Sequence, residues 1–146
     1  MQRIKIAGLE KSIGYNSMKP ITNYYNKKKL IGIKISNITE GSTPITSPDQ
    51  PFQIVTLKHK KGSYLKAHTH IPKKRQTERL QECLFVKRGK IKIDLYNSNK
   101  KYLQSLFLKE GQIFLLIEGG YGIHIIEDSE IFEFKNGPFL EDKQLI

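Results

Sequence analysis

The 146-residue chain has little cysteine, no tryptophan and no long apolar run. Its single cysteine, Cys83, excludes an intramolecular disulfide framework and any cysteine-based zinc finger. The longest uninterrupted apolar run, Ile113–Ile117, is far short of the ~20 residues that a membrane-spanning helix needs. The first residues are charged and lack the apolar stretch of a signal peptide. We therefore expect a cytoplasmic protein without a membrane partner.

Acidic residues are scarce in the first 81 positions, and arginine is scarce throughout. The net charge is +11, but residues 1–81 hold 16 Lys or Arg against four acids, whereas residues 82–146 hold nine against ten. Only four of the 25 basic residues are Arg, the residue whose planar fork suits base and phosphate recognition. Since no nucleic-acid-binding module is recognisable either, the charge favours an anionic small molecule over nucleic acid as partner.

The apolar residues that are present, 38% of the chain, form strand patterns. In 90–96, Ile91, Ile93 and Leu95 alternate with polar residues, which predicts a strand with one buried face. Ile31, Ile33 and Ile35 alternate in the same way, whereas the Pro-rich stretch 40–51 predicts a loop. Further strands are expected over 29–38, 52–58, 64–70, 83–87, 102–108, 112–117, 122–126 and 130–135.

These short strands are joined by Gly and Asn turns, and no segment has a convincing helical pattern. The sequence therefore predicts an all-β fold, a small single-domain antiparallel barrel or sandwich. We expect residues 31–146 to form this domain and residues 1–30 to form an N-terminal arm or an edge strand.

Two histidines and one glutamate have the spacing of metal ligands. His68 and His70 stand two residues apart, so on a strand their side chains lie on one face, about 6.6 Å apart. Glu82 shares the parity of Leu84 and Val86, which predicts that it points into the interior. Because a carboxylate among aliphatic side chains is costly unless a cation meets it, this pattern indicates a cation site.

His124 is expected to face inward with Gly122 and Ile126, where it would complete a shell of three His and one Glu. Such a shell suits a divalent transition metal such as Fe, Mn, Ni or Zn. Other interpretations stay open: His124 as a hydrogen-bonded core residue, or the histidine pair as a surface pair. Glu82 could also pair with Arg75 or Arg79 without any metal.

The stretch Gly62-Ser-Tyr-Leu-Lys-Ala-His68-Thr-His70 resembles the first half of the first cupin motif. Glu82-Cys-Leu-Phe-Val-Lys-Arg-Gly89 is similar to its second half, and Gly111 to His124 is similar to the second motif. More narrowly, residues 61–146 resemble the WbuC-type, RmlC-like cupin metalloproteins of surface-polysaccharide gene clusters. This resemblance implies a jelly-roll barrel, a homodimer, and His68, His70, Glu82 and His124 as metal ligands.

The chain departs from that pattern near the expected site. Eleven residues separate His70 from Glu82, so residues 71–81 form an extra loop. Tyr121 stands nearer the usual position of the last ligand than His124 does, so either residue could complete the metal shell. From this loop we expect Arg75, Arg79 and Gln81 to contact substrate, together with Tyr121; an Arg there could clamp a carboxylate or phosphate.

Three functions follow from this pattern. The first is a metal-binding cupin that acts on, or binds, an anionic sugar-like molecule in surface-polysaccharide synthesis. The second is a non-catalytic ligand-binding or regulatory cupin, and the third is a metal-independent nucleotide-sugar epimerase or ketoisomerase. The chain has no nucleophile elbow, P-loop or dinucleotide fingerprint. As an isomerase, epimerase or oxygenase of the first kind, it would therefore rely on the metal for its chemistry.

Overall fold

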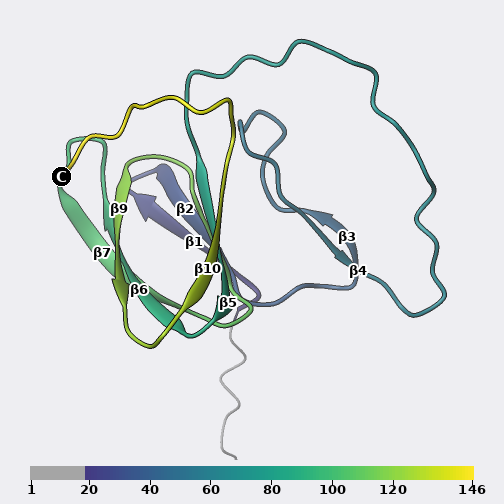
Figure 1. The fold of residues 1–146 in the computed structure, drawn as a ribbon, viewed down its shortest axis with the longest axis horizontal. Coiled ribbons are helices and arrows are strands. Elements are labelled where there is room, and N and C mark those ends of the chain that lie inside the picture. The colour runs from purple at the N-terminus through teal and green to yellow at the C-terminus, as the bar shows by residue number, and fades with distance from the viewer. Residues whose placement is uncertain (1–18) are drawn as a thin grey trace, which may run out of the picture.

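A computed structural model describes residues 19–146 and contains ten strands (Figure 1). Within this range no helix is present, so none could cross a membrane. Most of the expected N-terminal arm, residues 1–18, lies outside the described residues. The strands are β1 (Ile21–Asn26), β2 (Lys29–Ile35), β3 (Gly41–Pro44), β4 (Val55–Lys58), β5 (Glu82–Arg88), β6 (Lys90–Tyr96), β7 (Tyr102–Lys109), β8 (Ile113–Leu116), β9 (Gly120–Ile125) and β10 (Glu130–Lys135).

Two antiparallel sheets face each other across one core. The larger has the order β1-β2-β8-β5-β10 and the smaller the order β7-β6-β9, while β3 and β4 form a separate hairpin. The predicted all-β, antiparallel fold is confirmed. Among the described residues, no strand pairing joins the two sheets into a closed barrel. Their shared core contains Ile31, Leu84, Val86, Ile91, Ile93, Leu95, Leu106, Leu108, Phe114 and Leu116.

The outer face of the larger sheet has an apolar layer of its own. Cys83 packs there with Leu115 and Ile117, beneath Phe52 and Ile54 from the segment before β4. Cys83 therefore lies on the face of the sheet opposite Glu82. Burial raises the pKa of the Cys83 thiol to about 12. Because the thiolate is the reactive form, this thiol is a packing group rather than a nucleophile.

β2 carries a bulge that reverses its side-chain parity. Tyr24 pairs with Gly32 but Tyr25 pairs with Leu30, which leaves Ile31 as an extra residue. An extra residue shifts the following side chains to the other face. Ile31 therefore packs in the core between the sheets, whereas the isoleucines further along β2 pack on the outer face. The expectation that all three isoleucines share one face is wrong.

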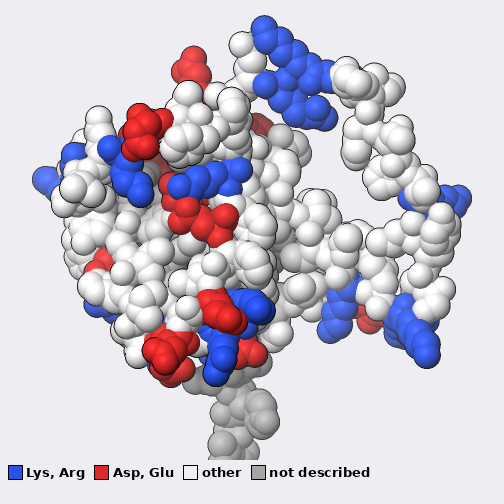
Figure 2. All heavy atoms as spheres, viewed as in Figure 1, with Lys and Arg blue, Asp and Glu red and all other residues white. Residues whose placement is uncertain are grey.

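A long loop, residues 59–80, connects β4 to β5. It arches away from the sheets in Figure 1, and every residue in it is exposed. The strand expected over 64–70 is not present, so that prediction is wrong. Figure 2 shows basic side chains spaced along this loop, whereas acidic and basic side chains intermingle over the sheets. We call this segment the 59–80 loop.

Candidate functional site

Four polar side chains converge at one end of the space between the two sheets. In β5, Glu82 pairs with Leu116 of the core, so the prediction that it points inward is confirmed. Lys135 of β10 lies opposite Glu82, and Glu133, two residues earlier, has the same parity. Tyr121 enters from the facing sheet, where it pairs with core residue Leu95. The four residues Glu82, Tyr121, Glu133 and Lys135 are called the inner-face cluster.

Hydrogen bonds and ion pairs connect all four members of this cluster. The Tyr121 hydroxyl donates to Oε2 of Glu82 and lies 3.3 Å from Oε2 of Glu133. The Lys135 ammonium lies 2.8 Å from Oε1 of Glu133 and 3.8 Å from Oε1 of Glu82. One phenol hydrogen and one ammonium group are thus shared by two carboxylates that come from neighbouring strands.

The surroundings of Tyr121 and Lys135 raise the pKa values of both side chains. Burial, reinforced by the Glu82 carboxylate, raises the pKa of Tyr121 far above its usual value. The hydrogen bond to Glu133 and the charge of Glu82 raise the pKa of Lys135. At neutral pH the cluster therefore offers a protonated phenol and an ammonium group. Two carboxyl side chains stand beside this one ammonium group, a composition that favours a cation or a hydroxyl-rich ligand.

His68 and His70 lie on the 59–80 loop. Their rings are 5.2 Å apart between centroids and nearly perpendicular, at 78°. His68 Nδ1 lies 3.0 Å from the carbonyl oxygen of Lys66, which is a local contact. Within residues 19–146, no group of three His, Cys, Asp or Glu side chains is close enough to hold a metal ion. The structure thus places the predicted donors in three separate places: the histidine pair, the inner-face cluster and His124.

His124 points to the outer face of the smaller sheet. It pairs with Lys92, whereas its neighbours Ile123 and Ile125 pair with core residues of β6. Its Nε2 lies 2.5 Å from Oδ2 of Asp94, also on the outer face. The expectation that His124 faces inward is wrong, because the pairing of β9 with β6 gives the inward positions to the odd-numbered residues.

The three predicted substrate contacts from residues 71–81 lie in different surroundings. Arg75 is exposed, and among residues 19–146 it donates only to the carbonyl oxygen of Lys73, at 3.4 Å. Arg79 is also exposed, and its carbonyl oxygen accepts a hydrogen bond from Asn136. Gln81 is completely buried, at 0% exposure. Its amide group donates to Gln50 and Ile117 and accepts from Phe52, so both of its amide hydrogens are already in use.

Two members of the inner-face cluster, Glu133 and Lys135, were not among the predicted site residues. The signal for them lies in the alternation of β10, where Ile131, Glu133 and Lys135 share one parity. Since Ile131 packs against the core, the two polar residues must also face inward. Because Glu133 and Lys135 follow Ile131 by two and four residues, the alternation of the strand would have predicted their inward position.

Neither the strand order nor the cluster specifies a particular family. In the comparisons with known proteins, no protein-family model, no curated protein and no solved structure matches this chain.

Proposed function

We propose that this protein is a cupin of jelly-roll type that binds a small, sugar-like molecule at the inner-face cluster. One observation carries the proposal: Glu82 and Tyr121, from facing sheets, meet through a hydrogen bond at the end of the shared core. Polar groups that converge beside an apolar interior are typical of small-molecule sites. The proposed role is in surface-polysaccharide synthesis, as the motif resemblance implies.

The proposal includes a divalent transition metal bound by Glu82 together with His68 and His70. Imidazole and carboxylate donors both suit such a metal, and the cluster brings two carboxyl side chains together. As the structure places them, the two donor groups do not form one shell, so metal binding requires the loop to fold toward β5. The hydrogen bonds of residues 60–78 are all local, so such a movement would break none to the sheets. A bound metal would supply Lewis acidity and would attract an anionic ligand.

Metal analysis of purified protein tests this proposal. Protein loaded with Fe, Mn, Ni or Zn and then desalted is expected to retain about one ion per chain, by plasma emission. His68→Ala and His70→Ala should each abolish retention, because two ligands rarely hold a transition metal against dilution.

Two histidines provide matched controls. His59→Ala changes another exposed histidine, the first residue of the same loop, whose Nε2 lies 3.1 Å from the Ser42 hydroxyl. His124→Ala changes the outward-facing histidine. Both variants are expected to retain the metal. Protein that takes up none of the four metals, or that loses them equally in all four variants, would contradict the metal site.

A second candidate function, metal-independent isomerisation of a nucleotide sugar, is favoured by the protonated phenol of Tyr121 beside the Glu82 carboxylate. In this reaction, a carboxylate would remove a proton from a sugar carbon and the phenol would donate one. Incubation of metal-free protein with nucleotide sugars in D₂O tests this function. Deuterium incorporation that is lost in Tyr121→Phe would support it, and its absence across a panel of nucleotide sugars would exclude it.

A further inference from the structure

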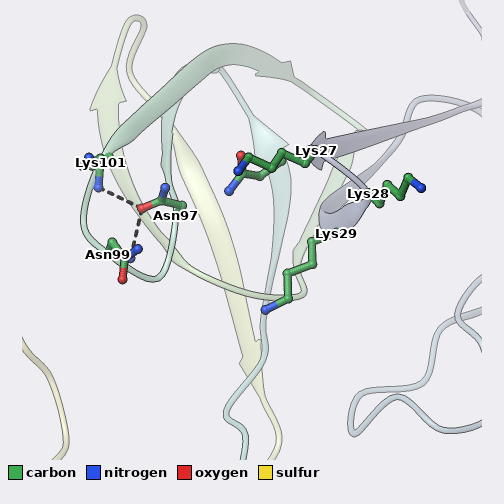
Figure 3. Close-up of a pocket in the computed structure, with 7 residues that line it drawn as sticks. Lys27, Lys28, Lys29, Asn97, Asn99 and Lys101 are labelled. Carbon is green, nitrogen blue, oxygen red and sulfur yellow. Dashed lines mark hydrogen bonds between the residues drawn. The ribbon is translucent and has the colours of Figure 1, made fainter.

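A hollow lined by lysine and asparagine lies between two surface turns, apart from the inner-face cluster (Figure 3). One turn joins β1 to β2 and the other joins β6 to β7. The hollow has a volume of about 730 Å³. This is within the range of small-molecule sites, roughly 300–1,000 Å³, and much larger than one phosphate ion needs. Its lining consists of Asn26, Lys27, Lys28, Lys29, Asn97, Asn99 and Lys101.

The lining carries four ammonium groups and no carboxylate. Lys29 is the one member with an acidic partner, since its Nζ lies 2.6 Å from Oε1 of Glu118. The ammonium groups of Lys27, Lys28 and Lys101 have no ion pair or hydrogen bond within residues 19–146. Lysines without an acidic partner therefore line the hollow from both turns, which favours a ligand with more than one negative charge.

A hydrogen bond and an ion pair, both to Glu118, connect the two turns that form the hollow. Glu118, just after β8, accepts a hydrogen bond from Ser98 at 2.9 Å and also pairs with Lys29, so it links the two turns. In the second turn, Oδ1 of Asn97 accepts from the backbone N–H groups of Asn99 and Lys101, both at 3.0 Å (Figure 3). The site is thus partly ordered before a ligand arrives, which lowers the entropic cost of binding.

Lys27 has a backbone conformation that its residue type disfavours. Its φ is 56°, in the left-handed region that Gly and Asn adopt more readily than Lys. Lys27 lies in the two-residue turn that closes the β1–β2 hairpin, and such turns require a positive φ. Asparagine at this position would therefore keep the turn conformation and remove the charge.

From the hollow and the unpaired lysines that line it from both turns, we infer that this is a second binding site, for the diphosphate group of a small molecule. Lysine ammonium groups bind phosphate oxygens as point charges. The amides of Asn26 and Asn99 make no hydrogen bond within residues 19–146 and are available for hydroxyl or base groups of the same ligand. The ligand class is inorganic pyrophosphate or a nucleoside diphosphate.

Calorimetric titration of metal-free protein with pyrophosphate, orthophosphate, adenosine diphosphate and uridine diphosphate tests this inference. Diphosphates are expected to bind more tightly than orthophosphate, and their affinity should fall as salt is added. The double variant Lys27→Asn/Lys101→Gln should lose at least about tenfold in affinity, since it removes two charged hydrogen-bond donors. Nucleoside diphosphates that bind more tightly than pyrophosphate would identify the nucleotide as the source of the diphosphate.

Three variants sharpen the test. Lys58→Gln/Lys61→Gln removes the same charge away from the hollow and should leave the affinity unchanged. Glu118→Gln should increase the affinity for diphosphate, because the Lys29 ammonium group then no longer pairs with a carboxylate of the protein. Lys27→Asn alone should weaken binding without lowering the melting temperature, since Asn tolerates the left-handed conformation.

Some results would overturn the inference. These are the absence of diphosphate binding, an equal loss in the two double variants, and tighter binding of a DNA or RNA oligomer that depends on Lys27 and Lys101. Glu82→Gln should not alter diphosphate binding. A failure of the diphosphate site is therefore distinguishable from a failure of the proposed function at the inner-face cluster.

Discussion

At the scale of single residues, burial separates groups that serve the fold from groups available for chemistry. Gln81 and Glu82 are neighbours in sequence, yet one is completely buried and the other retains 22% of its side-chain exposure. The Gln81 amide connects the segment before β4, the end of β8 and the start of β5. Glu82, in contrast, presents its carboxylate to other titratable groups. Two adjacent residues thus have different roles: Gln81 anchors neighbouring segments, and Glu82 belongs to the candidate site.

Replacement of Gln81 by leucine is expected to destabilise the protein strongly. The two side chains have similar size, but leucine would leave the groups of Phe52, Gln50 and Ile117 without their partner. An unsatisfied buried polar group costs about 1–3 kcal/mol, so a loss near 3 kcal/mol is expected in urea unfolding. Gln104→Leu, at an exposed position of β7, is the control and should change stability by less than about 0.5 kcal/mol. Similar small effects in both variants would contradict the anchor role.

Asp94 is expected to make stability depend on pH in the acid range. Hydrogen bonds from Ser105, and then from His124, lower the pKa of Asp94 from 3.8 to about 2. A carboxyl whose pKa is lowered by folding stabilises the folded state above its unfolded pKa. This contribution is complete above pH 4 and is lost as the pH falls from about 4 to 2. Asp94→Asn should therefore lose less stability than wild type between pH 5 and 2, in thermal unfolding. Asp128→Asn is the control, and equal slopes in wild type and Asp94→Asn would refute the prediction.

At the scale of elements, the bounds of strands with regular alternation could be predicted from the sequence, whereas the pairing between strands could not. The strands β6 and β10 have the predicted bounds, because alternation along a strand is a local property. β1 lies in a stretch predicted as arm or edge strand, and β3 in a stretch predicted as loop. Each is stabilised by pairing with the next strand along the chain, β1 with β2 and β3 with β4. The inward position of Glu82 followed from its own strand, whereas the orientation of His124 depended on its register with β6.

Two turn glycines should differ in their tolerance of alanine. Gly111, before β8, has a φ of 81° with open space around its missing side chain. Gly119, before β9, has a φ of 90°, and a Cβ there would collide with the carbonyl oxygen of Tyr96. Gly111→Ala should therefore cost about 1 kcal/mol from the backbone conformation alone. Gly119→Ala should cost about 2 kcal/mol or more, since steric overlap adds to the same strain. Chemical unfolding of the two variants measures the difference, and equal costs would show that the turn relaxes.

At the scale of the whole molecule, the 59–80 loop is the longest segment outside the strands among residues 19–146. It lies between β4 and β5, and its connections to the body are at its ends, through His59, Lys60 and Arg79. The exposed side chains of Tyr64, Leu65 and Ile71 have no apolar partner in the described core. Segments with few buried contacts open at low free-energy cost. The length of the 71–81 insertion could be read from the sequence, but its projection away from the sheets could not.

Limited trypsin digestion is expected to cut this loop first. Its Lys and Arg residues are exposed, and a protease needs an extended segment free of sheet hydrogen bonds. The fragments should stay associated, because β2 of the first fragment pairs with β8 of the second inside the larger sheet. Mass spectrometry locates the cuts, and gel filtration checks the association. First cuts within the sheets, or dissociation of the fragments after cleavage, would refute this expectation. If the metal site forms as proposed, Zn²⁺ or Mn²⁺ should slow the cleavage in wild type but not in His68→Ala.

The bulge at Ile31 predicts how this sequence can vary during evolution. Changes in side-chain volume at Ile31 should be compensated in the core between the sheets, at positions such as Leu84 or Phe114. Changes at Ile33 and Ile35 should instead be compensated at Cys83 and Leu115, on the opposite side of the same sheet. Three isoleucines that look equivalent in the sequence should therefore evolve as two independent groups. Relatives that lack the extra residue should show a single group.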